Sequence, residues 1–298
     1  MKVMLAQIAP KLGRLDDNLE LHRRIIAEAW ASGHDLVVFP ELSLTGYLLR
    51  DHVPNVALAA EELTGLFGGL GDGRERPLEV VVGFVELGAS YRCYNAAALL
   101  RLKPAQPPGR LAVHRKVHLP TYGMFDERRY FAPGRTFRAF QSGVLGRAGL
   151  LICEDLWHPS SAYVLSVDGP CNEGIQALIG MANSPARGVA DTTHDTVANL
   201  ETWRRLNGLY ASLFGLVLLH CQRVGVEDSY VFTGGSEVLA PGGEVLARAP
   251  LFAEQLLSAE LDIDSLVRWH RSVSPFTMAD DLDVVRRELE RVSVEAFR

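Results

Sequence analysis

Three residues of the sequence have the right types and positions to carry out acyl transfer together. Glu41, Lys116 and Cys153 each lie at or just after the end of a short segment that is predicted to form a β-strand. In open α/β sheets, active sites gather at strand ends, so the three side chains could meet. A thiol can attack a carbonyl carbon, a carboxylate can take the thiol proton, and an ammonium group can stabilise the resulting oxyanion.

Each of these residues also has an ordinary structural interpretation. A glutamate after a strand is often solvated or caps a turn, a lone lysine is usually on the surface, and a cysteine ending an apolar run is often an inert core residue. Spacing alone therefore does not establish a site. His114 and His118 could form a metal-binding pair, but Pro120 follows them and the HExxH pattern is absent, which favours a structural role.

Short apolar runs alternate with helical periodicity along the chain, which predicts one continuous α/β domain with a mixed sheet. The segment 116–135 reads as irregular, and Thr233-Gly234-Gly235-Ser236 reads as a turn between strands rather than a phosphate-binding loop. The tail 265–298 mixes helix formers with Pro275. We expect strands at 3–8, 35–39, 79–86, 91–101, 111–114, 148–153, 176–181 and 216–221, helices at 15–32, 54–67, 160–167 and 191–214, and two strands within 227–246 joined around Gly234-Gly235.

Composition narrows the possible functions. The chain has 298 residues, 48% hydrophobic and 22% charged, which excludes a disordered or collagen-like protein. Its net charge of -6 disfavours non-specific nucleic-acid binding. No apolar run reaches the roughly 18 to 20 residues that cross a bilayer, and no signal peptide is recognisable, so we expect a cytoplasmic protein. The four cysteines form no CxxC pair, which disfavours a zinc site or a disulfide scaffold.

Three sequence blocks together resemble the signature blocks of the nitrilase, or carbon–nitrogen hydrolase, superfamily. They are FPELSLTGY at 39–47, HRKVHLP at 114–120 and ICEDLWHP at 152–159, and they occur in the family's order. The resemblance runs from Met1 to about Asp264 and includes GSEVLAPGGEVLARA at 235–249, which is similar to a late hairpin of that family. We therefore expect a hydrolase domain at 1–264 and an extension at 265–298 that packs on the same domain or on a partner subunit.

The resemblance implies a four-layer αββα sandwich and a role for each of the three residues. Cys153 would be the nucleophile, Glu41 the general base, and Lys116 the oxyanion stabiliser, assisted by the backbone N–H of Glu154. A second glutamate follows the lysine in many members of the family. Glu127 is the best match here, with Asp126 beside it. The alternative for Glu127 is a simple salt bridge to Arg128 or Arg129.

The block around the nucleophile is most similar to the glutamine-hydrolysing domain of glutamine-dependent NAD synthetases. That similarity implies that Tyr47 and Tyr122 lie near the substrate, although both could be ordinary half-buried aromatics. Glu154, Trp157 and Phe125 are further candidates for the substrate pocket. The segment Asn183-Ser184-Pro185 matches a pocket wall of the family, and nearby Arg187 could bind a substrate carboxylate or a surface acid.

The favoured function is an amidase that cleaves a small primary amide or a carbamoyl C–N bond. The alternatives are a glutaminase subunit that supplies ammonia to a separate synthetase, and a catalytically silent scaffold. The intact set of Glu41, Lys116 and Cys153 disfavours the scaffold. The resemblance also implies that no metal or organic cofactor is needed, and that the protein is a homo-oligomer, most simply a dimer, that pairs through the helices at 160–167 and 191–214. From the composition we expect no nucleic-acid or membrane partner.

Overall fold

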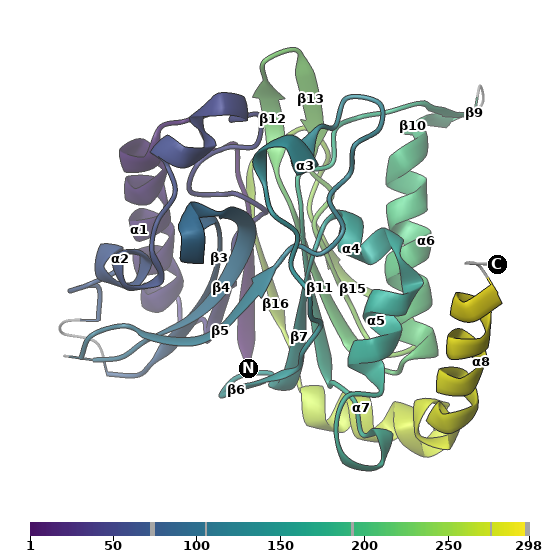
Figure 1. Ribbon diagram of the computed structural model, residues 1–298. Coiled ribbons are helices and arrows are strands. Elements are labelled where there is room, and N and C mark those ends of the chain that lie inside the picture. The colour runs from purple at the N-terminus through teal and green to yellow at the C-terminus, as the bar shows by residue number, and fades with distance from the viewer. Residues whose placement is uncertain (72–74, 105, 192–193, 275, 296–298) are drawn as a thin grey trace.

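Two six-stranded sheets form the centre of the computed structural model (Figure 1), which describes residues 1–71, 75–104, 106–191, 194–274 and 276–295. The first sheet has the order β16 (Gln255–Glu260), β1 (Lys2–Gln7), β2 (Leu36–Val38), β3 (Leu78–Leu87), β4 (Cys93–Leu102) and β5 (Gly109–Arg115). The second has the order β15 (Val245–Arg248), β14 (Glu237–Leu239), β11 (Val217–Gln222), β8 (Ala177–Ala182), β7 (Gly146–Ile152) and β6 (Phe140–Ser142).

Helices cover the outer faces of both sheets. Two small ribbons accompany them, β9 (Val189–Asp191) with β10 (His194–Val197) and β12 (Val224–Glu227) with β13 (Tyr230–Thr233). Figure 1 shows α1 (Leu15–Ala31) and α2 (Ala60–Leu66) beside the first sheet, and α5 (Pro159–Ser166) and α6 (Ala198–Leu213) beside the second. This arrangement confirms the expected αββα sandwich. The remaining helices are α3 (Glu127–Tyr130), α4 (Glu154–Trp157), α7 (Ile263–Val273), α8 (Leu282–Glu295) and four short 3₁₀ turns at Arg50–Asn55, Ala89–Tyr91, Pro170–Asn172 and Thr277–Ala279.

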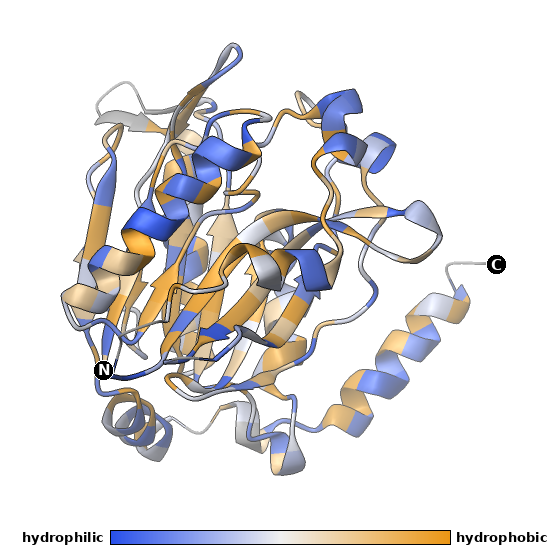
Figure 2. Ribbon diagram, turned by 90° about the vertical axis from the view of Figure 1, so that its left-hand side faces the viewer, coloured by the Kyte–Doolittle hydropathy of each residue, from blue (hydrophilic) through white to orange (hydrophobic). Residues whose placement is uncertain are grey.

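The apolar patterns of the sequence explain this layering. Alternate side chains such as Leu5 of β1 and Val38 of β2 are fully buried in one cluster with Leu150 and Ile152 of β7, so the two sheets share a core. On the outer face of the first sheet, Ile26 and the other apolar residues of α1 recur at the helical period and pack on that sheet. In Figure 2 the hydrophobic colour accordingly concentrates on the strands, whereas α1 carries both colours.

Strand direction brings the candidate residues to one end of the sandwich. In the first sheet β2 and β3 are parallel, and β5 runs in the same direction because it and β3 are both antiparallel to β4. In the second sheet β7, β8 and β11 are parallel. The carboxyl ends of β2, β5, β7 and β8 therefore lead into Glu41, Lys116, Cys153 and Asn183 respectively, at strand ends where α/β proteins commonly place active sites.

Several predicted elements differ in detail. The helix expected at 54–67 begins only at Ala60, and Pro54 lies in a preceding 3₁₀ turn. The helix expected from residue 191 begins at Ala198, because the preceding residues are rich in β-branched threonine and valine and 194–197 form β10. Residues 192–193 of that segment lie outside the described part. Gly234-Gly235 does join two strands, but β13 and β14 belong to different sheets. The hairpin of β14 and β15 is as expected.

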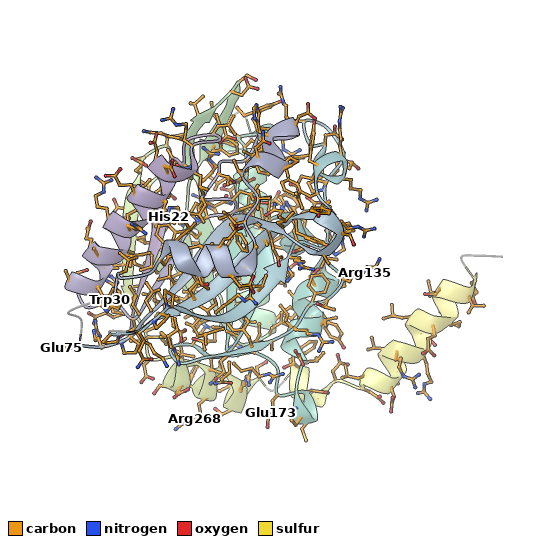
Figure 3. The ribbon with its side chains drawn as sticks, turned by 60° about the vertical axis from the view of Figure 1, so that its left-hand side comes forward. His22, Trp30, Glu75, Arg135, Glu173 and Arg268 are labelled. Carbon is orange, nitrogen blue, oxygen red and sulfur yellow. The ribbon has the colours of Figure 1, made fainter. Side chains whose placement is uncertain are left out.

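The C-terminal segment divides into a packed helix and an exposed one. Ile263 and Val267 of α7 are buried against the second sheet, so this helix, which spans the boundary expected at residue 264, belongs to the body. No residue of α8 is buried, and α8 stands apart from the body in Figures 2 and 3. Pro275 lies outside the described residues. In the described chain, no helix has both the length and the apolar character that crossing a membrane requires.

Candidate active site

Glu41 is held in a tight turn that follows β2. Its neighbour Leu42 has a φ of 46°, in the left-handed region that most residues avoid. Gly83 of β3 lies directly against this turn: a Cβ atom there would be 2.4 Å from the Leu42 nitrogen and 2.5 Å from the Pro40 oxygen. Only glycine therefore allows the Glu41 turn to approach the first sheet this closely.

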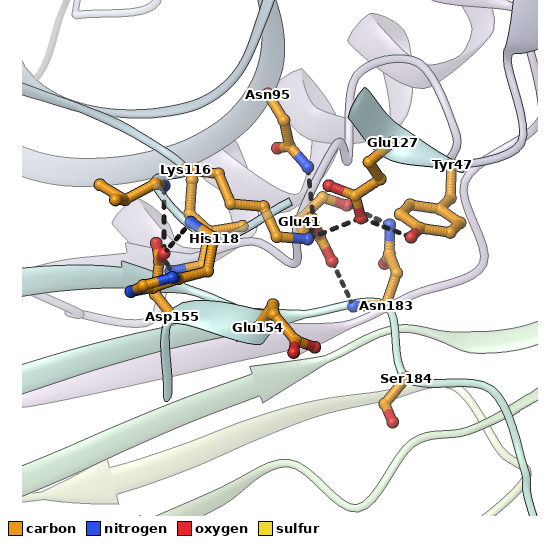
Figure 4. A network of polar contacts seen from close by, with 12 residues as sticks. Glu41, Tyr47, Asn95, Lys116, His118, Glu127, Glu154, Asp155, Asn183 and Ser184 are labelled. Atoms are coloured by element: carbon orange, nitrogen blue, oxygen red, sulfur yellow. Dashed lines mark hydrogen bonds and ion pairs between the residues drawn. The ribbon is translucent and has the colours of Figure 1, made fainter. Parts of the chain in front are cut away.

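Lys116 connects two buried carboxylates (Figure 4). Its Nζ donates to Glu41 Oε1 at 2.8 Å and to Glu127 Oε1 at 2.7 Å, and its side chain is fully buried. Burial alone would lower the pKa of Lys116, but Glu127 and Glu41 raise it well above its usual value. The amine therefore stays cationic at neutral pH, where it can stabilise negative charge.

Two asparagines fix the orientation of the Glu41 carboxylate. Asn95 Nδ2 donates to Oε1 at 2.7 Å, and the backbone N–H of Asn183 donates to Oε2 at 2.8 Å. The Asn183 side chain also donates to the backbone oxygen of Glu41 at 2.7 Å. Asn183 follows a strand end, as the other candidates do, whereas Asn95 lies within β4 and no sequence pattern indicated it.

Glu127 lies at the start of α3 and completes the cluster. It accepts a hydrogen bond from the Tyr47 hydroxyl at 2.5 Å in addition to the bond from Lys116. Its ion pair is thus with Lys116 rather than with Arg128 or Arg129. Burial, opposed in part by Lys116, raises the pKa of Glu127 to about 7. Its second oxygen, Oε2, is buried and has no hydrogen-bond partner among the described residues.

A second buried ion pair holds Tyr47 in place. Glu227 accepts hydrogen bonds from the backbone N–H groups of Tyr47 at 2.9 Å and Leu48 at 2.6 Å, and it pairs with Arg223 at 2.5 Å. Removing one partner of such a pair typically costs about 3–5 kcal/mol, because the other charge stays buried. No sequence pattern indicated this support, because Arg223 and Glu227 lie far along the chain from Tyr47.

Cys153 occupies a strained backbone position directly after β7. Its φ is 46° and its ψ is -99°, and its side chain is 7% exposed. The backbone is anchored on both sides, because its N–H donates to Met181 O at 2.7 Å and its carbonyl accepts from Leu156 at 2.9 Å. A conformation of this kind costs on the order of 1–3 kcal/mol and is concentrated at functional sites.

The charges around Cys153 keep its thiol protonated at rest. Burial foremost, and then the Glu41 carboxylate, raise the pKa of Cys153 well above its usual value, and the opposing effect of Lys116 does not compensate. The charges of Glu41 and Lys116 therefore both act on the sulfur of Cys153. A nucleophilic role requires a base that removes the proton as the sulfur reacts.

Polar and aromatic groups gather around Glu154, the residue after Cys153. The Tyr122 hydroxyl donates to the Glu154 carboxylate at 2.9 Å. The Arg187 guanidinium lies 4.9 Å from the centre of the Phe125 ring and 5.9 Å from that of Tyr122. Trp157, by contrast, is half-buried and packs edge-on against Trp203 at 5.3 Å, among residues of the core. The structure therefore groups Tyr122, Phe125 and Arg187 with Glu154, and directs Trp157 into the core.

The rings of His114 and His118 both stack on Phe137, but they do not form a pair directed at a common ion. His114 Nε2 lies 2.8 Å from Asp155 Oδ2, whereas the His118 ring stacks on His158 with centroids 3.7 Å apart. Across the described ranges, no group of three or more His, Cys, Asp or Glu side chains is arranged to hold a metal ion.

The raised pKa of Glu127 predicts a specific dependence of stability on pH. Between the usual value near pH 4.5 and about pH 7, the folded protein retains a proton that the unfolded chain has lost. This group therefore lowers the free energy of unfolding as pH rises through that window. Glu127→Gln cannot titrate, so the wild type should lose stability relative to the variant between about pH 5 and about pH 8. Urea denaturation of both proteins at the two pH values measures this difference, and a constant difference would contradict the shift.

Comparisons with known proteins identify the family of this chain. The family model described as "Carbon-nitrogen hydrolase" matches residues 2–271. A glutamine-dependent NAD(+) synthetase of Thermotoga maritima is 31% identical over 268 residues, which is 90% of this chain but only 43% of that protein. The chain thus spans less than half of this relative. A nitrilase of Pyrococcus abyssi is 29% identical over 266 residues, covering 88% of this chain and 90% of the nitrilase.

A solved structure extends the comparison to the whole fold. The crystal structure of a carbon–nitrogen hydrolase from Helicobacter pylori matches with a TM-score of 0.81 and 24% identity, covering 97% of this chain and 98% of that one. At this identity the likeness concerns the fold, and it agrees with the αββα sandwich described above. The match of the family model over most of the chain shows that the protein belongs to the carbon–nitrogen hydrolase family.

Proposed function

We propose that the protein is a cysteine-dependent amidase that releases ammonia from a small amide through a thioester. The observation that carries the proposal is the fully buried Lys116 ammonium bridging Glu41 and Glu127, with both Lys116 and Glu41 acting on the thiol of Cys153. This set supplies a nucleophile, a base and a cation for the oxyanion within one desolvated cluster.

The proposed reaction has two halves. In the first, Glu41 takes the Sγ proton of Cys153 while the sulfur attacks the amide carbon, and Lys116 and the backbone N–H of Glu154 stabilise the oxyanion. The C–N bond then breaks, the proton passes from Glu41 to the leaving nitrogen, and ammonia and a thioester result. In the second half, Glu41 takes a proton from water as it attacks the thioester, and Cys153 leaves as a thiol with the acid released.

A substrate with N–H donors fits the polar character of this cluster. Glu127 Oε2 is a buried acceptor with no partner among the described residues, and a primary amide carries two N–H donors. The Glu127 carboxylate, held by Tyr47 and Lys116, would orient such an amide for attack. A buried polar group that lacks a partner is costly, so an amide bound there would gain affinity.

The proposal is tested with a panel of neutral amides, carbamoyl compounds and glutamine. Ammonia and the acid product should form in equal amounts, and intact-protein mass spectrometry should show an acyl adduct on Cys153. If no compound releases ammonia, and an electrophilic amide leaves Cys153 unmodified, the amidase proposal fails and the scaffold alternative gains support.

A glutaminase is the second candidate, and the groups around Glu154 favour it. A carboxylate at Glu154 and a guanidinium at Arg187 complement the amino and carboxylate groups of an α-amino acid. The relative from Thermotoga maritima, which this chain matches over 43% of its length, is a glutamine-dependent NAD(+) synthetase. A kcat/KM for glutamine well above that for uncharged amides of similar size would select this candidate.

We also predict that two copies of the chain pair through the outer face of α5 and α6. Val164, Leu209 and Leu213 on these helices are 42%, 48% and 38% exposed, although large apolar side chains gain most when buried. Light scattering at micromolar concentration should give twice the mass of 32.7 kDa. Leu209→Glu should lower that mass, whereas Val226→Glu, which alters an exposed apolar residue on β12, should not. A monomeric wild type would contradict the prediction.

A further inference from the structure

Asp155 is a fully buried carboxylate whose two oxygens accept four hydrogen bonds. Oδ1 accepts from the backbone N–H groups of Val117 at 3.0 Å and His118 at 2.9 Å. Oδ2 accepts from the backbone N–H of Ile152 at 3.3 Å and lies 2.8 Å from His114 Nε2. Figure 4 shows Asp155 directly beside the chain segment that follows Lys116. Such complete pairing is what a buried charge requires.

The four donors come from two segments that carry different parts of the site. Val117 and His118 follow Lys116 just after β5 of the first sheet, whereas Ile152 is the last residue of β7 in the second sheet and directly precedes Cys153. Asp155 itself lies in α4, the short helix that Cys153 begins. One carboxylate therefore joins the backbone that carries the ammonium group to the backbone that carries the thiol, and this joint lies outside the cluster of Glu41, Lys116 and Glu127.

His114 is the only side chain, among the described residues, that donates to this carboxylate. It lies on β5, two residues before Lys116, and it is 8% exposed. Its neighbourhood includes a surface groove of about 990 Å³, which His114 helps to line. A different side chain at position 114 can therefore be accommodated, and Asp155 keeps its three backbone donors after the substitution. This makes His114 a better point of intervention than Asp155, where any change would leave several backbone donors unpaired.

We propose that Asp155 and His114 are positioning residues that set the place of Lys116 relative to Cys153. This inference rests on the proposed function, in which Lys116 stabilises the oxyanion formed when Cys153 attacks. Oxyanion stabilisation depends strongly on geometry, since a misplacement of about 1 Å can cost on the order of 10²-fold in rate. Loosening the joint should slow the step that builds the oxyanion much more than other reactions of the thiol, on which Lys116 acts only through its charge.

The test compares His114→Leu, which removes the donor, with His114→Gln, whose amide can still reach Asp155. His34→Leu is the matched control. His34 is likewise a buried histidine in a hydrogen bond, at 2.8 Å to Ser258, but it lies away from Lys116 and Cys153. If His114→Leu does not purify as a folded protein, His114→Asn replaces it, because its shorter amide cannot reach Asp155.

Two reactions of Cys153 are measured on each variant. The first is single-turnover acylation by the best amide of the panel, which forms an oxyanion at carbon. The second is modification by methyl methanethiosulfonate, a small neutral thiol reagent that forms no such oxyanion. Peptide mass mapping distinguishes a label on Cys153 from one on Cys171, which is exposed and can also react. KM and thermal denaturation are recorded alongside.

We expect His114→Leu to acylate about 10- to 100-fold more slowly than the wild type, with unchanged KM and a much smaller change in thiosulfonate reactivity. His114→Gln should recover most of the loss, and His34→Leu should change thermal stability alone. Unchanged acylation in His114→Leu, or a parallel fall of both reactions that glutamine does not rescue, would overturn the positioning role. A wild type that acylates with no amide would overturn the proposed function first, and this inference with it.

Discussion

Cys153→Ala is expected to abolish ammonia release and leave the fold intact. In the proposed mechanism the sulfur forms the only covalent bond to substrate, and no neighbouring group can replace it: Lys116 is cationic and the carboxylates are paired with it. The change removes little volume, so the free energy of unfolding should change by only about 1 kcal/mol. The strained backbone remains, because alanine also has a Cβ atom and gains nothing at a φ of 46°.

A matched variant separates the chemistry from the loss of a buried thiol. Cys221 is fully buried in the same core cluster, and its Sγ lies 3.3 Å from the backbone oxygen of Val38. Cys221→Ala should therefore lose similar stability and keep its activity. Circular dichroism and urea denaturation monitor folding, and ammonia detection monitors turnover. Release of ammonia by Cys153→Ala at a rate comparable to the wild type would show that another group is the nucleophile.

The sequence allowed the centre of the site to be predicted because its members share one local rule. Glu41, Lys116 and Cys153 each follow a strand, and a strand end can be recognised from a short window of residues. The structure brings Glu41 and Lys116 into direct contact, and the Glu41, Lys116 and Glu127 charges all act on the Cys153 thiol. Their roles in catalysis remain the proposal that the variants described here test.

The supporting groups could not be predicted in the same way, because they depend on which segments become neighbours. Asn95 contacts Glu41 only because β4 pairs beside β3 in one particular register. Asp155 lies within a recognisable block, but two of its four donors are backbone N–H groups of the segment that follows β5 of the other sheet. Glu227 likewise acts across 180 positions of sequence on the backbone of Tyr47. Such contacts have no local pattern.

The boundaries of the helices could likewise be predicted only where one local pattern decides them. Leu15–Ala31 agreed closely with expectation, because its apolar period continues unbroken and Gly33 follows its end. The start of α6 was missed because two conflicting preferences meet there, a helical period after Ala198 and β-branched residues before it. The local conformational preferences of these residues do not decide whether the helix extends further or a strand pair precedes it.

Glu41→Gln should slow acylation of Cys153 by at least about 10²-fold, the usual scale for a lost general base. Two effects of the change oppose each other. The Glu41 charge raises the pKa of Cys153, so its removal makes the thiolate easier to form. The same change removes the nearby acceptor for the proton, and the amide of glutamine is not basic enough to replace it. We expect the second effect to dominate, because burial keeps the thiol mainly protonated in either protein.

The hydrogen bonds of the cluster predict how much folding stability Glu41→Gln loses. A glutamine oxygen can still accept from Lys116 and Asn95, which both donate to Oε1 in the wild type. Its NH₂ group would then face the backbone N–H of Asn183, which donates to Oε2 at 2.8 Å. One hydrogen bond is lost, so a destabilisation of about 1–3 kcal/mol is expected without loss of the fold.

Single-turnover acylation followed by intact-protein mass spectrometry measures the effect directly, with Glu127→Gln as the matched control. Both variants replace a buried carboxylate that accepts from Lys116, and above about pH 8, where Glu127 is largely ionised, both remove a negative charge from the cluster. If Glu41 is the base, the rate for Glu41→Gln should also rise more steeply with pH, because hydroxide must then remove the proton. Near-wild-type acylation by Glu41→Gln, combined with a large loss in Glu127→Gln, would transfer the base role to Glu127, whose pKa of about 7 would suit it to that task.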